Sequence, residues 1–301
     1  MGKCSRNITI VLLASILTLP CWARFVGYDI ARNSVVFVYG ADPLGHVNTS
    51  SPLATAFLMS IPLRNVQGKE TAILVTARHV VDPVWAGCPP HQNLTRIFLR
   101  LNKHNFDPAS NESGFEYVPV DLTLVGPQKN VFTNVDTSVD AVVIRIPNSI
   151  TEDKYEIQAI STDYFPTPDE AKQIDSGLEV MSVGLLPAFP GVFRNYPVFK
   201  FGRVSIKPSE RIQVPCALNE VPIALRLWLI AANQAPGSSG SPVFTIPPDF
   251  SAARTVLMGV QSVAFDGSEV AGITPSHYIY EIIDNEKIPD WDLKEGNPTR
   301  R

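Results

Sequence analysis

The strongest constraint on the fold is the recurrence of short runs of β-branched and aromatic residues, each bounded by turn residues. Proline and glycine supply 26 and 18 of the 301 residues, without a G-X-Y repeat. This frequency of turn residues argues against a helical bundle, and long helical patterns do not alternate with the strand runs as they do in βαβ folds. Hydrophobic residues make up 45% of the chain, which is enough for a substantial core. We therefore expect an all-β globular protein.

The predicted strands fall into two groups of six, one on each side of a polar, proline-containing stretch near residues 147–175. They are 34–39, 54–61, 72–76, 96–101, 117–125 and 141–146, followed by 178–183, 198–206, 223–230, 242–245, 256–263 and 277–283. This count suits two six-stranded antiparallel β-barrels packed face to face. We expect one barrel at 24–150, the second at 151–285 and a charged C-terminal tail at 286–301.

The first residues have the pattern of a signal peptide. Lys3 and Arg6 precede an apolar run at 8–19, and smallish residues lead to a cleavage position after Ala23. The run is shorter than the roughly 20 residues that a membrane-spanning helix needs. We expect a secreted or periplasmic protein without a transmembrane segment in the mature chain. Acylation of Cys21 is the alternative, disfavoured because the residues just before it are not small.

The cysteines and the charge exclude several classes of site. Removal of the leader leaves Cys88 and Cys216, which we expect to form a disulfide in an oxidising compartment, with two separate buried thiols as the alternative. The four cysteines show no CxxC spacing, so neither a metal site nor a cofactor is expected. The net charge of −4 argues against a broad nucleic-acid-binding surface.

A serine flanked by glycines is the most informative local pattern. In the segment 234–242 (QAPGSSGSP), Ser239 lies between a turn and an apolar strand. The flanking glycines allow the N–H groups of Gly237 and Ser239 to converge and form an oxyanion hole. An ordinary Gly/Ser turn is the alternative, and the segment taken alone favours it. The GxSxG pattern of α/β-hydrolases does not fit, because Ser241 occupies the second glycine position.

A serine nucleophile needs a base, and a base needs an orienting group. His79 follows the apolar strand 72–76, whereas the other four histidines have polar or turn neighbours. Asp140 opens a nearly all-apolar strand, where a carboxylate is costly unless it has a partner. Asp136 is the competing carboxylate, but it lies in a polar stretch that favours solvation. The order His79, Asp140, Ser239 is that of the two-barrel serine proteases.

On the motifs Thr76-Ala77-Arg78-His79, Asp140-Ala141-Val142-Val143 and Gly237-Ser238-Ser239-Gly240-Ser241-Pro242, the chain resembles the trypsin-like (chymotrypsin-fold) serine peptidases. The resemblance covers roughly residues 31–285 and is nearer the bacterial envelope type than the digestive type. It implies that His79 acts as base and then acid, that Asp140 orients it and that Ser239 attacks the scissile carbonyl. It also implies oxyanion-hole N–H groups from Gly237 and Ser239, and protein or peptide substrates.

Two departures from that family limit the comparison. Digestive enzymes carry, before the nucleophile, an Asp that pairs with a newly cut N-terminus, and Ser238 cannot form this ion pair. We therefore expect activity without processing beyond removal of the leader. Arg78 stands where Ala is usual, and we expect its side chain to point to solvent.

The resemblance also implies a set of substrate-binding residues. Asn233 would lie at the base of the primary pocket, where a Lys- or Arg-specific enzyme has Asp. Ser262 and Ala264 would lie on the strand that pairs with the substrate backbone, and Ala264 would narrow the pocket. We expect small or medium uncharged P1 side chains. A catalytically inactive binding or scaffold protein of the same fold is the alternative, and a secreted adhesin is less favoured because it would not explain Asp140.

Overall fold

The computed structural model describes residues 23–63, 68–86, 93–110, 112–186, 189–215, 221–234, 237–248, 254–265 and 267–285, with side chains described from residue 27 onward. Most of the predicted leader, the predicted disulfide partners Cys88 and Cys216, and the tail 286–301 lie outside the described residues and stay predictions. Within the described ranges, no helix combines the length and the hydropathy needed to cross a membrane.

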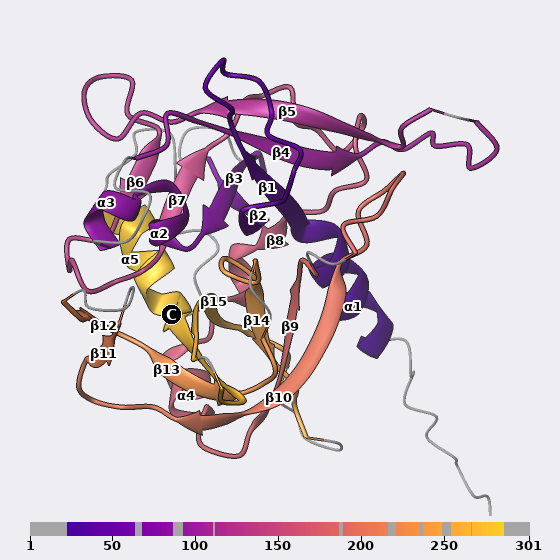
Figure 1. Cartoon of the computed structure of the whole chain (residues 1–301). Helices are drawn as coiled ribbons and strands as arrows, with labels where there is room; N and C mark the ends of the chain where they lie inside the picture. Colours follow the sequence, from indigo (N-terminus) through magenta and orange to yellow (C-terminus); the bar gives the residue numbers. More distant parts are fainter. Residues whose placement is uncertain are drawn as a thin grey trace, which may run out of the picture.

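Two β-sheet units make up the molecule, one in the upper and one in the lower half of Figure 1. The upper unit has the strands β1 (Val35–Gly40), β2 (Ala54–Pro62), β3 (Glu70–Thr76), β4 (Arg96–Asn102), β5 (Phe115–Asp121), β6 (Val131–Thr133), β7 (Val142–Arg145) and β8 (Ile160–Ser161). Their order is β5-β4-β1-β2-β3-β7-β6, and β8 pairs in parallel with β2. The lower unit is a closed barrel of order β10-β13-β16-β15-β14-β9.

The closed barrel contains β9 (Glu179–Gly184), β10 (Val198–Ile206), β13 (Trp228–Ala231), β14 (Pro242–Thr245), β15 (Leu257–Ala264) and β16 (Val270–Pro275). A separate hairpin pairs β11 (Ile212–Val214) with β12 (Ile223–Leu225). The all-β two-barrel prediction is therefore confirmed as a fold class, with the second barrel closed and its six strands antiparallel.

The first unit differs from the prediction because its sheet is curled but open. Its edge strands β5 and β6 do not form a ladder among the described residues; they meet only where the chain leaves β5 and approaches β6. There the Asn130 N–H donates to the Thr123 carbonyl at 3.0 Å, and the Thr123 N–H donates to Asn130 Oδ1 at 2.8 Å. With only three residues, β6 is too short to continue the pairing along β5.

Among the described residues, four apolar clusters are found, and three of them form the main cores, as the alternation of side chains along the strands predicts. One core lies inside the first sheet and includes Leu58, Leu74 and Leu99. A second lies inside the closed barrel around Val180, Val204 and Ile230. The largest joins the two units, because the opposite faces of the same strands pack against each other there.

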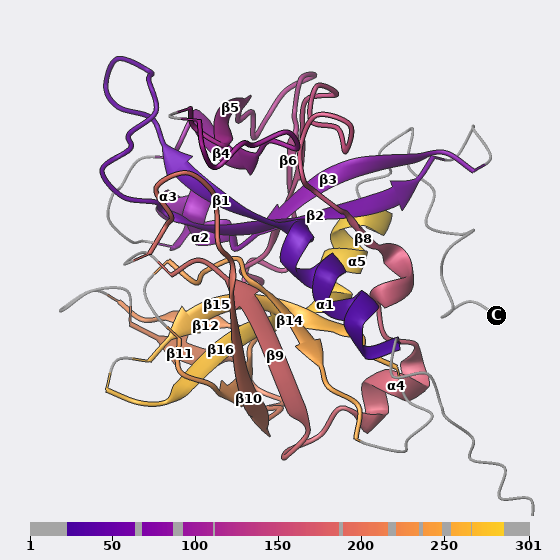
Figure 2. The same ribbon diagram turned by 90° about the vertical axis from the view of Figure 1, so that its right-hand side faces the viewer.

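Two predicted strands of the second group differ in the structure. The run 223–230 is divided into β12 and β13, which belong to different sheets. Residues 277–283 belong to helix α5 (Ser276–Asn285), and the sixth barrel strand is β16 just before it. The buried side chains Ile279, Ile282 and Ile283 lie three and four residues apart, which is helical spacing. Helix α5 packs against β6, β7 and β15, and the unpredicted helix α1 (Ala23–Ser34) packs against β1, β2 and β8. In Figure 2 both helices lie near the boundary of the two units.

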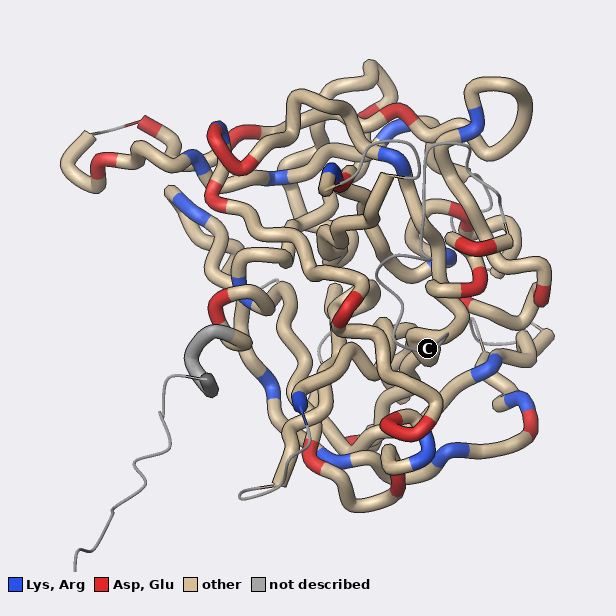
Figure 3. Tube along the Cα trace, turned by 180° about the vertical axis from the view of Figure 1, so that it is seen from behind, with Lys and Arg blue, Asp and Glu red and all other residues tan. Residues whose placement is uncertain are grey.

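Charged residues of both signs are interspersed along the chain trace (Figure 3). Several form surface ion pairs, such as Arg203 with Glu179 and Arg254 with Glu170.

Candidate active site

The strand pairing of the first sheet brings His79 and Asp140 together across 61 residues of sequence. Helix α2 (Arg78–Val81) begins two residues after β3 ends at Thr76, and Asp140 lies two residues before β7 begins at Val142. Thr76 and Val142 are partners in the β3–β7 ladder, so both residues lie at the same end of the two strands. The His79 backbone N–H donates to Asp140 Oδ1 at 2.9 Å.

A hydrogen-bond chain connects Asp140, His79 and Ser239. Asp140 Oδ2 lies 2.8 Å from His79 Nδ1, and His79 Nε2 lies 3.1 Å from Ser239 Oγ. With Asp140 ionised, Nδ1 carries the proton and donates to the carboxylate, which leaves Nε2 free to accept the Ser239 hydroxyl proton. The Asp140 side chain is 1% exposed and that of His79 31% exposed, so the chain runs from the interior to an open site.

Burial and pairing act in opposite directions on the two titrating groups. Burial alone lowers the pKa of His79, but attraction by the Asp140 carboxylate and the hydrogen bond between them raise it to a net value above the usual 6.5. Burial raises the pKa of Asp140, but His79 and the hydrogen bonds that Asp140 accepts lower it below its usual 3.8. The pair therefore favours an ionised Asp140 and can stabilise a charged imidazolium.

Asp140 is held by residues of the second unit as well. The Ser262 hydroxyl of β15 donates to Asp140 Oδ2, and the Thr274 hydroxyl of β16 donates to the Asp140 carbonyl at 3.1 Å. These bonds satisfy a carboxylate that would be costly to bury alone. They also fix the first sheet to the barrel at the point where His79 meets Ser239.

The Ser239 loop is anchored to the first sheet through Thr55 of β2. The Thr55 N–H donates to the Ser239 carbonyl at 2.9 Å, and the Thr55 hydroxyl donates to the Gly237 carbonyl at 3.0 Å. Gly237 has a φ of 84°, a conformation that favours glycine. Within the described residues, the N–H groups of Gly237 and Ser239 have no acceptor, as an oxyanion hole requires.

Gly240 allows the two units to approach each other closely. Its φ is 86°, and a Cβ atom at this position would lie 1.9 Å from the Thr55 carbonyl oxygen and 2.2 Å from Thr76 Oγ1. The Gly240 N–H donates to the Gln261 carbonyl at 2.8 Å, so the loop cannot move away without losing this bond. A side chain at this position would force the nucleophile loop off the first sheet.

We expect Gly240→Ala to lower the free energy of unfolding by about 3–5 kcal/mol, since backbone strain adds to a steric overlap. Gly177→Ala is the matched control, because Gly177 has a φ of 90° but no atom within 4 Å of the added Cβ. The control should lose only about 1–2 kcal/mol. Urea unfolding measures both, and equal losses in the two variants would contradict the steric argument.

The structure corrects the expectation for Arg78. Its guanidinium does not point to solvent but pairs with Asp82, with Nη2 2.9 Å from Oδ2. It also lies 4.5 Å from the centre of the Trp85 ring. Arg78 therefore stabilises the short helical segment that carries His79, between α2 and α3 (Pro83–Ala86).

The predicted substrate-binding residues are only partly brought together. Ser262 and Ala264 line a cavity of about 200 Å³ together with His79 and Asp140. Most of its remaining walls are apolar: Trp85, Ala86, Val214, Pro215, Ile223, Leu225 and Val263. The Ser262 carbonyl also lies 3.4 Å from Ser239 Oγ. Asn233 does not line this cavity, and its side chain is exposed.

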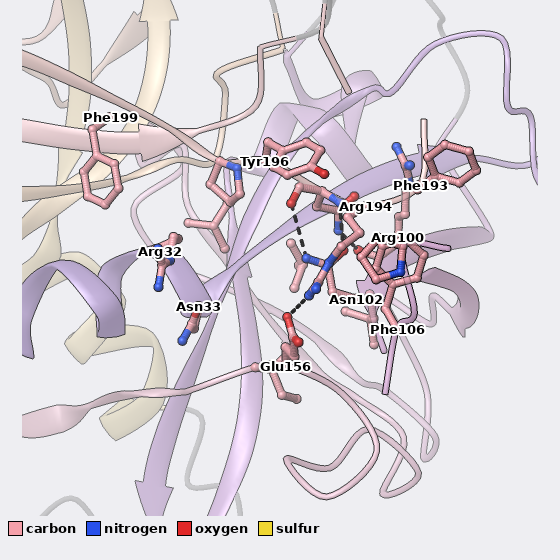
Figure 4. A pocket seen from close by; sticks show the side chains of 17 residues that line it. Arg32, Asn33, Arg100, Asn102, Phe106, Glu156, Phe193, Arg194, Tyr196 and Phe199 are labelled. Atoms are coloured by element: carbon pink, nitrogen blue, oxygen red, sulfur yellow. Dashed lines mark hydrogen bonds and ion pairs between the residues drawn. The ribbon is translucent and has the colours of Figure 1, made fainter. Parts of the chain in front are cut away.

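A larger cavity of about 780 Å³ lies elsewhere, beside α1 and the chain that connects β9 to β10 (Figure 4). None of the residues His79, Asp140 and Ser239 lines it. Its buried Arg100 donates to the carbonyls of Pro190 and Gly191, at 2.8 and 2.6 Å, and thereby ties the connecting chain to β4.

Sequence reasoning missed three residues that support the site. They are Thr55, which anchors the nucleophile loop, and Lys200 and Gln234, which lie behind it. The predicted strand 198–206 contains both Lys200 and Arg203, so a charged residue within it did not by itself single out Lys200. Thr55 gave no signal either, because a threonine in a strand is ordinary.

Comparison with known proteins adds structural neighbours only. Neither a family model nor a curated protein matches the chain. Among solved structures, it is similar to the active form of the Rv3671c protease from M. tuberculosis, with 15% identity, a TM-score of 0.48 and coverage of 94% of this chain and 92% of that chain. An inactive form of this protease has 15% identity and a TM-score of 0.47, with coverage of 88% of this chain and 95% of that chain. The inactive form of its serine-to-alanine mutant has 14% identity and a TM-score of 0.46, with coverage of 88% of this chain and 92% of that chain.

Proposed function

We propose that this protein is a serine endopeptidase of the trypsin-like type, which hydrolyses peptide bonds through His79, Asp140 and Ser239. The observation that carries the proposal is the continuous hydrogen-bond chain from the buried Asp140 through His79 to Ser239 Oγ. A structural protein has no need for a buried carboxylate that orients a partly exposed imidazole toward a serine hydroxyl. The apolar cavity beside His79 supports a substrate that brings side chains to the site.

In the first half of the reaction, Ser239 Oγ attacks the scissile carbonyl carbon while its proton passes to His79 Nε2. Asp140 stabilises the imidazolium, and the N–H groups of Gly237 and Ser239 bind the oxyanion. His79 then gives the proton to the leaving amine, which departs and leaves an acyl-enzyme. In the second half, His79 takes a proton from water, the hydroxide attacks the ester, and the proton returns to Ser239 Oγ as the carboxylic acid product leaves and loses its own proton to water.

Labelling with a fluorophosphonate probe tests the proposal on residues 24–301, together with cleavage of an unfolded protein and of a small ester. We expect labelling and cleavage of internal peptide bonds. Ester hydrolysis without peptide cleavage would identify an esterase instead, and a chain that is neither labelled nor active would be the inactive scaffold.

We also propose export by the leader with a mature N-terminus at Arg24, which N-terminal sequencing of the exported protein tests.

We propose a preference for small or medium uncharged side chains at P1. Asn233, expected at the base of the primary pocket, carries no charge to pair with a Lys or Arg side chain, and Ala264, on the strand expected to pair with the substrate, lines the cavity beside His79. Peptides with Ala or Val at P1 should show a kcat/KM at least about tenfold above those with Lys, Arg or Glu. Peptides that carry the same charged residues four positions away from P1 serve as the control. A peptide library dominated by charged P1 residues would contradict this specificity.

A further inference from the structure

A lysine points into the end of the closed barrel, directly behind the nucleophile loop. Side chains along β10 alternate between the two faces of the barrel wall, so Lys200, Gly202 and Val204 share one face. Val204 belongs to the core inside the barrel. Lys200 pairs across the ladder with Ser182 of β9, and two residues before Ser182 the same face carries the buried Val180. Both lines of evidence place the Lys200 side chain on the interior face of the barrel.

The Lys200 ammonium connects the start of the loop, at Gln234, to Ser238, which lies between the two oxyanion-hole amides. Its Nζ donates to Ser238 Oγ at 2.8 Å and to Gln234 Oε1 at 3.4 Å. The other end of the Gln234 amide donates to Ser182 Oγ at 3.0 Å. Ser238 is 1% exposed and lies between Gly237 and Ser239, so its side chain faces the barrel interior, away from solvent.

This ammonium has no carboxylate partner among the described residues; its bonds go to a hydroxyl and an amide. Burial lowers the pKa of Lys200, without an opposing attraction from a neighbouring carboxylate. A half-buried cation without a counter-ion is costly, so its retention calls for a compensating role. The position of Lys200 suits such a role, because its positive charge lies behind amides that must be held in place before an oxyanion can bind.

We propose that Lys200 is a positioning residue that holds the oxyanion-hole loop in its active geometry through Ser238 and Gln234, so that the uncleaved chain is active as folded. The inference rests on the proposed peptidase function. Lys200 does not touch the reacting atoms; it acts through Ser238 on the amides on either side of it. An ion pair with a newly cut N-terminus is then unnecessary, because the cation comes from β10.

The test compares Lys200→Met, which keeps the side-chain length, with Lys200→Arg and with Arg203→Met. Arg203 lies on the same strand but is exposed and pairs with Glu179 at the surface, so it is the matched control. We expect Lys200→Met to lower kcat by about 10- to 100-fold with KM within about twofold, because lost oxyanion stabilisation acts on the transition state. Lys200→Arg should recover part of the loss, and Arg203→Met should change neither constant.

Hydrogen exchange of the Gly240 and Ser241 amides, which donate to the Gln261 and Ser238 carbonyls, gives a readout that does not depend on activity. Exchange should be faster in Lys200→Met than in the wild type, and unchanged in Arg203→Met. The milder variant Ser238→Ala should change exchange and kcat in the same direction if Lys200→Met does not fold. Unchanged exchange of the Gly240 and Ser241 amides in both variants would overturn the proposal, as would a loss of activity confined to substrates with acidic P1 residues. A wild-type protein that shows no Ser239-dependent labelling defeats the peptidase proposal instead, and the exchange comparison still decides the role of Lys200.

Discussion

Replacement of Ser239 by alanine is expected to remove fluorophosphonate labelling entirely and to reduce kcat for peptide hydrolysis by roughly 10⁵- to 10⁶-fold. The hydroxyl is the only group at this position that can form the acyl-enzyme, and its 3.1 Å contact with His79 Nε2 has no substitute in alanine. Binding and the oxyanion hole would still give a residual rate above that of water. Substrate affinity should change little, since Ser239 contributes no pocket wall.

Ser241→Ala is the matched control for Ser239→Ala. Ser241 lies two residues away in the same segment, and its buried hydroxyl has no hydrogen-bond partner among the described residues. The control should retain labelling and a kcat close to that of the wild type. Labelling that persists in Ser239→Ala would show that another residue reacts, and the assignment of the nucleophile would then be wrong.

The second large effect concerns the orientation of the imidazole. Asp140→Asn is expected to lower kcat by about 10⁴-fold while the fold is kept, because the amide donates to Nδ1 and places the imidazole proton on Nε2. In that tautomer His79 cannot accept the Ser239 proton. Stopped or continuous assays with a chromogenic peptide measure the loss.

The pH profile of the same variant separates this effect from misfolding. In the wild type, kcat/KM should fall as pH drops through the pKa of His79, since the protonated ring cannot act as a base, and this midpoint should lie above 6.5. Asparagine removes the attraction that raises the pKa, while burial still lowers it, so the midpoint should move to lower pH. An unshifted acid limb in Asp140→Asn would mean that Asp140 is not the group that sets the His79 pKa.

The sequence predicted the fold class, and for a physical reason it singled out three residues that the structure joins by hydrogen bonds. Asp140 stands out because a carboxylate before an apolar strand needs a partner, and His79 stands out because a strand ends just before it. Their contact follows from antiparallel pairing of the two strands, a rule that holds for any sequence of this kind. The geometry of the three side chains, in contrast, depends on packing between the units, which no local pattern encodes.

The mistakes have equally specific causes. The run 277–283 is apolar enough for a strand, and only the burial of Ile279, Ile282 and Ile283 reveals its helical period. The first sheet stays open because β6 is short, and the length of a strand cannot be predicted from local sequence propensity. Lys200 could not be assigned because the inward face of β10 is fixed by its neighbours β9 and β13 in the barrel, partners that lie up to about 30 residues away.

Thr55 links the two halves of the molecule at the place where chemistry would occur. The Thr55 carbonyl accepts a hydrogen bond from the Thr76 hydroxyl of the first unit, and its N–H and hydroxyl donate to the Ser239 loop of the second. Under the proposed function, the first unit would supply the acid and base and the second the attacking oxygen, so neither half alone would hold the whole reaction centre. A newly synthesised chain would then have no peptidase activity until its second half has folded and docked, because only the assembled seam brings the three side chains into contact.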